Sequence, residues 1–403
     1  MEYEFSNRMR TLRPSAIREI MKMFTSQESI MLAGGNPAVE SFPIEEIKKI
    51  SSEILESMAP AIFQYGMTEG FPPLRAHVVS WLKNRYGIDK PGDELIITSG
   101  SQQAVELTCR AFLDEGDAVI CENPSYMGAL NIFRSYNANL VGVDSEPDGI
   151  SIAGLEKALA ETPNVKLVYL IPNFQNPTGI TMSLAKRRAA YEMCAARGVV
   201  IIEDNPYGEL RYRGVDLPTI KSMDEAGIVV YCGSFSKIFS AGIRIGFALA
   251  ASPIARRIVL GKQVSDVHSN TYAQALLAKY FEDYDIDAHI EFIRKIYARK
   301  SALMLRCMDE HLSACSYQVP DGGLFIWCEL PGGMDSMDFC VRAAKRCVAV
   351  VPGSAFTVDP DAKCSAFRLN YSTPTDEKIE KGIAILGEVL KECLAEEKTE
   401  AAV

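Results

Sequence analysis

The sequence predicts an α/β fold, with a three-layer large region around a mostly parallel seven-stranded sheet and a smaller α+β region beside it. Between about residues 95 and 250, short β-branched runs alternate with longer stretches in which apolar residues recur every three to four positions. The chain has 403 residues, more than one hydrophobic core normally supports. A second packed region is therefore expected.

The alternating part of the sequence contains seven expected strands and four expected helices. The strands are Leu95 to Thr98, Ala118 to Cys121, Leu140 to Val143, Val165 to Ile171, Val199 to Glu203, Ile228 to Cys232 and Ile245 to Ala250. The helices are Gln102 to Leu113, Met127 to Arg134, Ile152 to Ala160 and Leu184 to Ala196. Apolar strands separated by amphipathic helices are typical of a parallel sheet that is covered on both faces.

After about residue 275 the pattern changes, and the smaller region is expected there. A long helical stretch is predicted from Tyr272 to Met308 and a final helix from Thr375 to Ala395, with strands at Phe325 to Glu329, Val348 to Val351 and Phe367 to Tyr371. We therefore predict a large domain over residues 45–280 and a small C-terminal domain over 281–403. Residues 1–44 are expected to contribute to the small domain and to the substrate pocket.

Composition excludes several classes of protein. The net charge of -10 argues against nucleic acid as a partner, because phosphate binding needs an excess of Lys and Arg. The eleven cysteines include no Cys-x-x-Cys pair and the four histidines show no ligand spacing, so no metal site is predicted. The longest uncharged run, Leu167 to Ala185, contains Pro and Gly, and the start has no apolar signal segment. We expect a cytoplasmic protein without a membrane segment.

The strongest chemical signal is Tyr231-Cys-Gly-Ser-Phe-Ser-Lys237, followed by Ala241-Gly-Ile-Arg-Ile-Gly246. A lysine just after a buried strand can lose its proton through desolvation and a nearby cation, which makes its amine nucleophilic. Lys237 is therefore a Schiff-base candidate. Arg244, with the hydroxyls of Ser234 and Ser236 close by in the sequence, suits a phosphate dianion.

Three further segments place polar residues directly after expected strands, where open α/β sheets bind their ligands. Asp204, in Val200-Ile-Ile-Glu-Asp-Asn-Pro-Tyr207, needs a cation to offset its burial, and a protonated ring nitrogen would serve. Asn176, in Ile171-Pro-Asn-Phe-Gln-Asn-Pro-Thr-Gly179, can donate into the same crevice. Ser101, in Thr98-Ser-Gly-Ser-Gln-Gln103, opens a helix whose first N–H groups suit an anion.

These four segments, in this order, resemble the class I/II aminotransferases of fold type I, which depend on pyridoxal 5'-phosphate (PLP). The resemblance extends from about Arg13 to Tyr371. Within that family the sequence is most similar to the 2-aminoadipate and kynurenine group, through Pro14-Ser-Ala-Ile-Arg18, Leu32-Ala-Gly-Gly-Asn-Pro37 and Gln64-Tyr65-Gly66. The family fold agrees with the α/β pattern.

The resemblance implies a role for each matched residue. The catalytic residues would be Lys237, which carries the cofactor, Asp204, which pairs with its ring nitrogen, and Tyr207. The cofactor-binding residues would be Ser101, Gln102, Tyr126, Asn176, Asp204, Tyr207, Ser234, Ser236, Lys237, Arg244 and, from a partner subunit, Tyr65. The substrate-binding residues would be Arg18, Gly35, Asn176 and Arg368, with Arg368 on the α-carboxylate. Asn36 departs from the group's usual pattern near the pocket mouth.

The resemblance further implies a homodimeric transaminase with small-molecule partners. It would move an amino group between an L-amino acid (2-aminoadipate, aromatic or branched-chain) and 2-oxoglutarate by a ping-pong mechanism. A fold type I PLP lyase acting on cysteine conjugates and a non-catalytic PLP-binding sensor remain alternatives. The Ser-x-x-Lys pattern of Ser234 to Lys237 also occurs in penicillin-binding proteins, but no Lys-Thr-Gly follows it.

Overall fold

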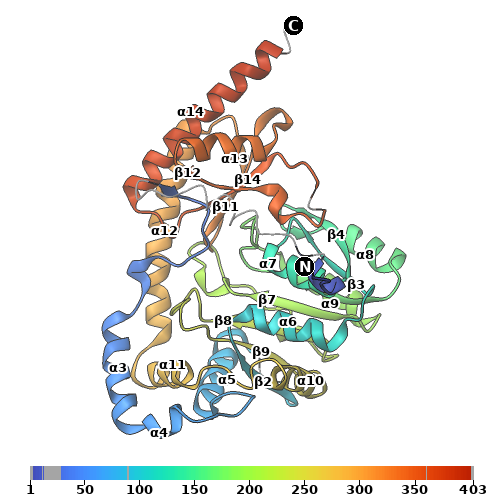
Figure 1. Ribbon diagram of the computed structural model, residues 1–403, viewed down its shortest axis with the longest axis vertical. Helices are drawn as coiled ribbons and strands as arrows, with labels where there is room; N and C mark the ends of the chain where they lie inside the picture. The colour runs from blue at the N-terminus through green and yellow to red at the C-terminus, as the bar shows by residue number, and fades with distance from the viewer. Residues whose placement is uncertain (1–2, 11, 13–28, 89, 360, 401–403) are drawn as a thin grey trace.

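A computed structural model describes residues 3–10, 12, 29–88, 90–359 and 361–400. Its largest feature is an eight-stranded sheet, and a smaller sheet lies next to it (Figure 1). In spatial order the large sheet consists of β2 (Asp93–Thr98), β9 (Gly246–Ala251), β8 (Val229–Ser234), β7 (Val200–Asn205), β6 (Val165–Leu170), β3 (Ala118–Asn123), β4 (Asn139–Glu146) and β5 (Gly149–Ile150). The predicted α/β fold class is confirmed.

Five neighbouring strands of this sheet, β8, β7, β6, β3 and β4, run parallel to one another. β9 is antiparallel to both of its neighbours, β8 and β2. All seven predicted strands are present, and the eighth, β5, is a two-residue partner of β4 at the sheet edge. A segment that short carries no periodic pattern, which is why the sequence did not reveal it.

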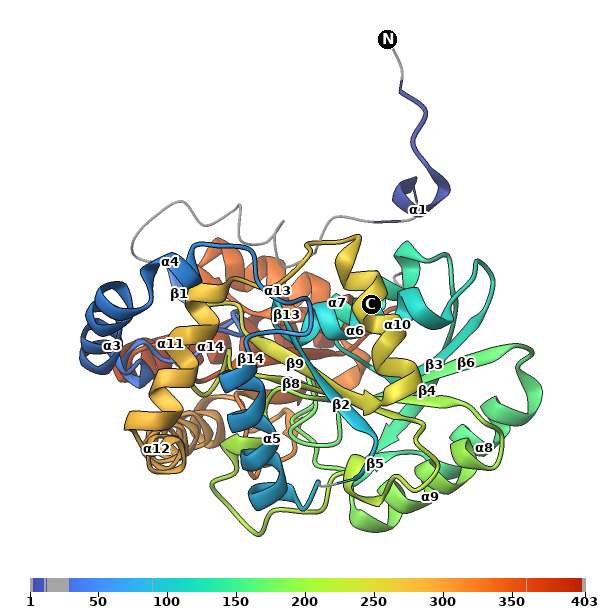
Figure 2. The ribbon, with the colours of Figure 1, turned by 90° about the horizontal axis from the view of Figure 1, so that it is seen from below.

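Helices cover both faces of the large sheet (Figure 2). One face is covered by α6 (Ser101–Phe112), α7 (Met127–Ser135) and α10 (Ser252–Gln263), and the other by α5 (Pro72–Tyr86), α8 (Ile152–Glu161) and α9 (Leu184–Ala195). The strands alternate between two cores: on β6, Leu167 and Tyr169 face one core, while Val168 and Leu170 face the other. This period of two explains why the central strands are largely apolar on both faces.

The helices begin and end where local chemistry favours it. The Ser151 hydroxyl accepts a hydrogen bond from the Gly154 N–H at the start of α8, and Ser183 caps α9 in the same way. The predicted helix from Tyr272 to Met308 is instead two helices, α11 (Thr271–Asp283) and α12 (Ile286–His311). The prediction of one continuous helix was wrong because Asp285 caps the backbone N–H groups of Asp287 and Ala288 and starts a new helix.

The smaller sheet is antiparallel, in the order β10 (Ser316–Tyr317), β11 (Phe325–Glu329), β14 (Ala366–Asn370) and β13 (Val351–Pro352). Helices α12, α13 (Ser336–Lys345) and α14 (Asp376–Glu400) pack around it. The short strand β1 (Ile30–Met31) pairs in parallel with β12 (Val348–Ala349), so the N-terminal segment joins the C-terminal part of the chain. The domain limits at residues 44 and 280 stay a prediction.

The remaining helices lie at the side and at the N-terminus. These are α1 (Asn7–Arg10), α3 (Ile44–Ser57) and α4 (Ala59–Ile62), with 3-10 turns at Val39–Ser41, Gly208–Leu210, Lys221–Met223, Pro331–Gly333 and Gly353–Phe356. None of the helices within the described ranges is both long and apolar enough to cross a bilayer.

Candidate active site

A pocket opens where the parallel strands of the large sheet end. It is lined by Ser101, Gln102, Tyr126, Ile171, Asn176, Asp204, Pro206, Tyr207, Ser234, Ser236, Lys237 and Arg244. Apart from Tyr65, every residue predicted to bind the cofactor is in this set. Segments separated by more than a hundred residues therefore meet at one edge of the sheet, as the strand-end argument predicted.

Lys237 lies in the turn that follows β8. Its Nζ donates a hydrogen bond to the carbonyl oxygen of Gly35 at 2.6 Å. Burial lowers the pKa of Lys237 to about 8, and the positive charges of Arg244 and Arg368 lower it in the same direction. A sizeable fraction of the amine is therefore neutral near physiological pH, as a nucleophile or a general base requires.

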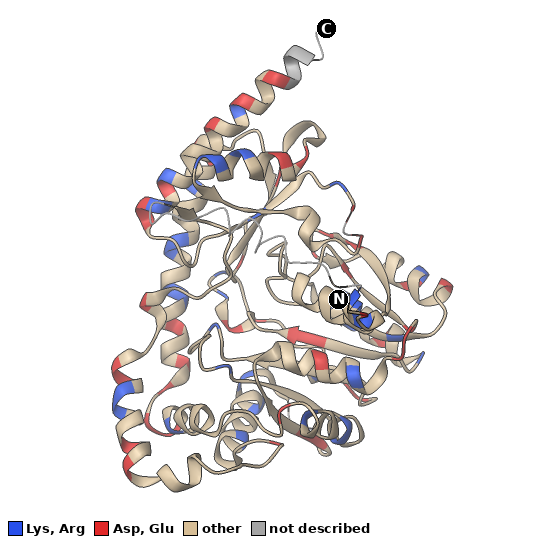
Figure 3. Cartoon of the chain, viewed as in Figure 1, with Lys and Arg blue, Asp and Glu red and all other residues tan. Residues whose placement is uncertain are grey.

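Asp204 lies at the end of β7, and Figure 3 shows this strand partly in red because it carries acidic residues. Its Oδ2 accepts a hydrogen bond from the hydroxyl of Tyr169 at 2.7 Å, whereas its Oδ1 is buried and has no hydrogen-bond partner among the described residues. Burial raises the pKa of Asp204 to about 6, although the hydrogen bond from Tyr169 acts in the opposite direction. An unpaired buried carboxylate oxygen fits a ligand that brings its own N–H donor.

An anion-binding turn forms one wall of the pocket. Gly100 has a φ of +78° and immediately precedes α6, whose first two residues, Ser101 and Gln102, line the pocket. The positive φ of Gly100 explains the glycine, and a Cβ at this position would also crowd the Arg244 guanidinium. Arg244 donates to the Ser236 hydroxyl at 3.2 Å and to the Ser99 carbonyl oxygen at 3.2 Å.

Two tyrosines and an amide complete the pocket. Asn176 Nδ2 donates to the Tyr207 hydroxyl at 3.3 Å, and both side chains are buried. Elsewhere in the lining, the Tyr126 hydroxyl donates to Gln102 Oε1 at 3.2 Å. The burial of Tyr207 raises the pKa of its phenol, so this hydroxyl stays protonated and remains a hydrogen-bond donor.

Arg368 lies on β14 of the smaller sheet and reaches the edge of the pocket. One terminal nitrogen donates to Asn176 Oδ1 at 2.7 Å, and the other donates to the Ala33 carbonyl oxygen at 2.7 Å. Its guanidinium carbon lies 4.2 Å from the centre of the Phe325 ring and 4.9 Å from that of Phe356. Arg368 is 3% exposed, and within the described part of the chain its Nε has no hydrogen-bond partner and its guanidinium forms no ion pair. A buried cation without a carboxylate partner suits an anionic ligand.

The other residues singled out in the sequence are not among the described residues that line the pocket. Gly35 contacts Lys237 through its carbonyl oxygen. Asn36 uses its carbonyl oxygen to accept from the hydroxyls of Ser372 and Thr373. Tyr65 is 82% exposed and is not part of the pocket lining; it packs edge-on against His268. Arg18 lies outside the described residues.

Tyr169 is a residue of the site that sequence reasoning missed. It is fully buried on β6, and its hydroxyl orients Asp204 on the neighbouring strand. Nothing in the apolar run from Val165 to Ile171 shows that this particular side chain faces Asp204. Register provides the only signal: Tyr169 pairs with Ile202, two positions before Asp204, so both side chains lie on the same face of the sheet.

The pocket residues fit a ligand with three features. The turn at Gly100 and Ser101, with Arg244, fits a phosphate; the free Asp204 oxygen fits a protonated ring nitrogen; and the Lys237 amine fits a carbonyl carbon. No group of three or more His, Cys, Asp or Glu residues in the described part of the chain could hold a metal ion. Together these features are typical of an α/β enzyme whose lysine reacts with a carbonyl group and whose turn binds a phosphate.

Comparisons with known proteins agree with this class. The profile of the "Aminotransferase class I and II" family matches residues 27–386. The chain is 39% identical over 399 residues to aromatic-amino-acid aminotransferase 1 of Thermococcus litoralis, covering 97% of this chain and 95% of that protein. The chain belongs to the class I and II aminotransferases, and the predicted transaminase class is confirmed.

Solved structures show the same similarity. One is a kynurenine aminotransferase from Pyrococcus horikoshii, in complex with PMP, KYN as substrates and KYA as products. It superposes on this chain with a TM-score of 0.93, at 39% sequence identity and with 97% of both chains covered. The alpha-aminoadipate aminotransferase of Thermus thermophilus, complexed with N-(5'-phosphopyridoxyl)-L-leucine, gives a TM-score of 0.89 at 36% identity, covering 97% of this chain and 98% of that one.

Proposed function

We propose that this aminotransferase uses PLP to move an amino group between an L-amino acid and 2-oxoglutarate by a ping-pong mechanism. One observation carries the proposal: a single pocket brings together a lysine of lowered pKa, an unpaired buried carboxylate oxygen and an anion-binding turn. Those are the three features by which a protein can hold PLP. The solved relatives with pyridoxal-derived ligands support the same cofactor.

Each pocket residue would have a defined task toward the cofactor. Lys237 would hold it covalently, and Asp204 would keep a proton on its ring nitrogen. Tyr207 and Asn176 would donate hydrogen bonds to its phenolic oxygen, and Tyr126 would stack on its ring. Its phosphate would be bound by Ser101, Gln102, Ser234, Ser236 and Arg244, with Tyr65 of a second copy. When bound, PLP supplies an electron sink for the electron pair of a substrate C–H bond.

The protein would provide positioning and proton transfer. Arg368 would bind the substrate α-carboxylate through two parallel N–H donors, after exchanging its contacts with Asn176 and Ala33 for that carboxylate. The Lys237 amine, when neutral, would remove the proton from the substrate Cα as a general base. A fixed carboxylate keeps the Cα–H bond within reach of this amine.

For the amino donor we propose 2-aminoadipate, an aromatic or a branched-chain amino acid. The names of similar proteins support the first two: the solved relatives include a kynurenine and an alpha-aminoadipate aminotransferase, and the Thermococcus litoralis relative is an aromatic-amino-acid aminotransferase. Arg18 would meet a distal carboxylate or move aside for an aromatic ring. A homodimer in the cytoplasm stays a prediction.

A panel of amino donors tests the proposal. The purified holoenzyme is incubated with each donor and either 2-oxoglutarate or pyruvate, and the oxo acid products are measured. We expect glutamate to form from 2-oxoglutarate with at least one of the proposed donors. Formation of pyruvate and ammonia from cysteine without any acceptor would support the lyase instead, and no turnover with any pair would contradict the transaminase mechanism. Arg18→Ala should change the ratio of 2-aminoadipate to aromatic activity.

A further inference from the structure

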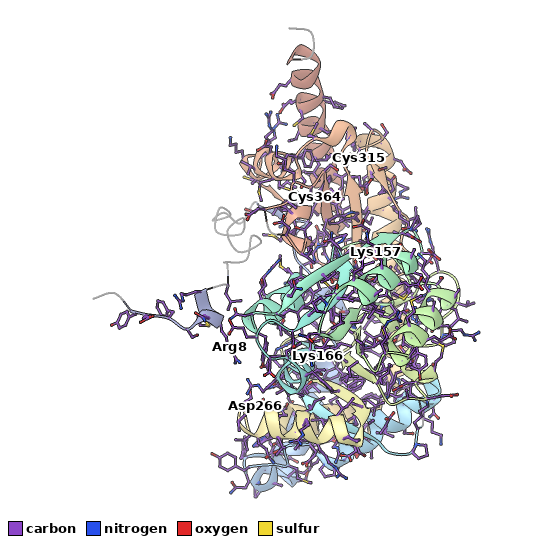
Figure 4. All side chains as sticks on the ribbon, turned by 90° about the vertical axis from the view of Figure 1, so that its right-hand side faces the viewer. Arg8, Lys157, Lys166, Asp266, Cys315 and Cys364 are labelled. Carbon is purple, nitrogen blue, oxygen red and sulfur yellow. The ribbon has the colours of Figure 1, made fainter. Side chains whose placement is uncertain are left out.

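A second buried lysine lies behind the anion-binding turn, outside the pocket. Lys262 is on α10, is 0% exposed, and belongs to a group of polar side chains that we call the turn cluster: Ser99, Gln103, Lys262, Asp266 and Ser269. Figure 4 labels Asp266, which follows the end of α10 (yellow). None of these side chains lines the pocket, and nothing in the proposed reaction uses them.

Lys262 is the centre of the turn cluster. Its Nζ donates to Gln103 Oε1 at 2.9 Å, to both carboxylate oxygens of Asp266 at 2.9 Å and to the Ser269 hydroxyl at 3.0 Å. Gln103 Nε2 in turn donates to Asp266 Oδ2 at 2.8 Å. Because each member contacts at least one other, loss of the ammonium group would leave several buried polar atoms with fewer partners.

The cluster holds the anion-binding turn from behind at Ser99. Gln103 Oε1, the same atom that Lys262 contacts, accepts a hydrogen bond from the Ser99 backbone N–H at 2.8 Å. On the pocket side, the Ser99 carbonyl oxygen accepts from Arg244 at 3.2 Å. Ser99 is thus bound by the turn cluster through its N–H and by the pocket arginine through its carbonyl oxygen. Gly100, which follows it, has a positive φ and depends on such contacts to keep its conformation.

The cluster also connects the turn to the loop after α10. The Ser269 hydroxyl contacts the Ile97 carbonyl oxygen at 3.4 Å, on the strand that leads into the turn. The Ser269 carbonyl oxygen is 2.8 Å from the ring nitrogen Nδ1 of His268, whose ring packs against exposed Tyr65. Lys262 therefore fixes two segments at once, the turn that faces the pocket and the loop behind Tyr65.

We propose that Lys262 is a positioning residue for the cofactor phosphate, holding Ser99 and the start of α6 in the anion-binding geometry through Gln103 and Asp266. The proposal rests on the proposed PLP-dependent function. In this role Lys262 affects the affinity for a ligand through the ligand's phosphate and not through its ring or its aldehyde. The geometry supports this selectivity, since the direct contacts of the cluster reach the turn at Ser99, and none of them joins Asp204, Tyr207 or Lys237.

The test compares two ligands that differ only in the phosphate. Apo-protein is titrated with PLP and with pyridoxal, and dissociation constants are measured for the wild type and Lys262→Met. We expect the variant to bind PLP about tenfold to a hundredfold more weakly, the range for loss of a charged hydrogen bond. Pyridoxal, which lacks the phosphate, should bind with a dissociation constant within about twofold of the wild type.

Lys221→Met is the matched control, because Lys221 is also 0% exposed on its side chain and pairs with two carboxylates, Asp93 and Asp224, which are not in the pocket. It should lower stability without a selective loss of PLP. If Lys262→Met does not fold, Asp266→Asn gives the same comparison, since Asp266 is partly exposed.

Three results would overturn the proposal: unchanged PLP affinity, an equal loss for both ligands, or the same selective loss in Lys221→Met. If wild-type protein binds neither ligand, the proposed function fails as well. If wild type binds PLP and only the selectivity is missing, this inference alone fails.

Discussion

Lys221 and Lys237 lie beyond opposite ends of strand β8, and they differ in whether carboxylates surround the amine. Lys221 precedes the strand, and its Nζ lies 3.0 Å from carboxylate oxygens of both Asp93 and Asp224. Lys237 follows the end of β8, and among the described residues no carboxylate lies within ion-pair distance of its amine. The Lys221 charge is neutralised by carboxylates within the protein, whereas the described part of the chain offers the Lys237 amine no such carboxylate.

The two lysine sites also differ in how completely the buried carboxylates near them are hydrogen-bonded. Asp224 accepts backbone hydrogen bonds from Gly227, Ile228 and Val229 in addition to the Lys221 contact, so its lone pairs are well used. In the pocket, by contrast, no described residue forms a hydrogen bond with Asp204 Oδ1. A buried polar group without a partner costs free energy, and a ligand that supplies the missing contact is one reason for a protein to retain such a group.

The largest expected effect follows from removing the pocket lysine. Lys237→Ala should lower kcat on the order of 10⁴-fold or more, because the amine both holds the cofactor and moves the proton. Its free energy of unfolding should stay within about 1 kcal/mol, since the lost contact is one hydrogen bond to Gly35. Urea unfolding and steady-state kinetics measure the two quantities.

Lys221→Met should show the reverse pattern. Removing this ammonium leaves Asp93 and Asp224 without their cation, which costs about 3 to 5 kcal/mol of stability. The kcat of the folded fraction should stay within about twofold of wild type, because Lys221 does not line the pocket. A Lys221 variant that is stable but inactive, or a Lys237 variant that unfolds, would invalidate the distinction.

A smaller effect is expected at the carboxylate. Asp204→Asn should lower kcat by about 10² to 10³, because an amide cannot stabilise a proton on the ring nitrogen. Tyr169→Phe removes only the hydrogen bond to Oδ2 and should lower kcat by roughly tenfold. Kinetics and the absorbance spectrum of the bound cofactor report both variants. Equal effects of the two substitutions would mean that Tyr169 does more than orient Asp204.

The smallest predicted effect is a shift in pH dependence. Apo-protein should capture PLP at a rate that rises with pH and levels off above about 8, because only the neutral Lys237 amine attacks and burial lowers its pKa to about 8. Arg368→Met removes one of the cations that lower this pKa, so the midpoint should move to higher pH. Stopped-flow absorbance follows capture. A midpoint that stays fixed or falls in the variant would show that Arg368 does not influence Lys237.

Most of the fold and most of the pocket could be predicted from the sequence, for a physical reason. The parallel strands are largely apolar, and the polar residues at or just after their ends lie at one sheet edge, so Asn176, Asp204 and Lys237 could be brought together without coordinates. Strand order and register could not be read in this way, because they depend on pairing between distant segments.

Residues that act through contacts across the fold were therefore missed. Tyr169 reaches Asp204 from a neighbouring strand, and Lys262 reaches the anion-binding turn from α10, 159 positions from its partner Gln103. Arg368 could be proposed for the substrate only by resemblance, since its contact with Asn176 joins residues 192 positions apart. The helix break at Asp285 was local, but the capping aspartate was hidden within an otherwise continuous helical pattern.

The covalent site of the cofactor is the most direct measurement of the central claim. The holoenzyme is reduced with borohydride, digested, and the lysine that carries a pyridoxyl group is located by mass spectrometry. The account predicts a single modified residue, Lys237, and no modification of Lys221 or Lys262, whose amines are engaged by carboxylates. Modification of a different lysine, or a protein that takes up PLP without any modified lysine after reduction, would contradict it.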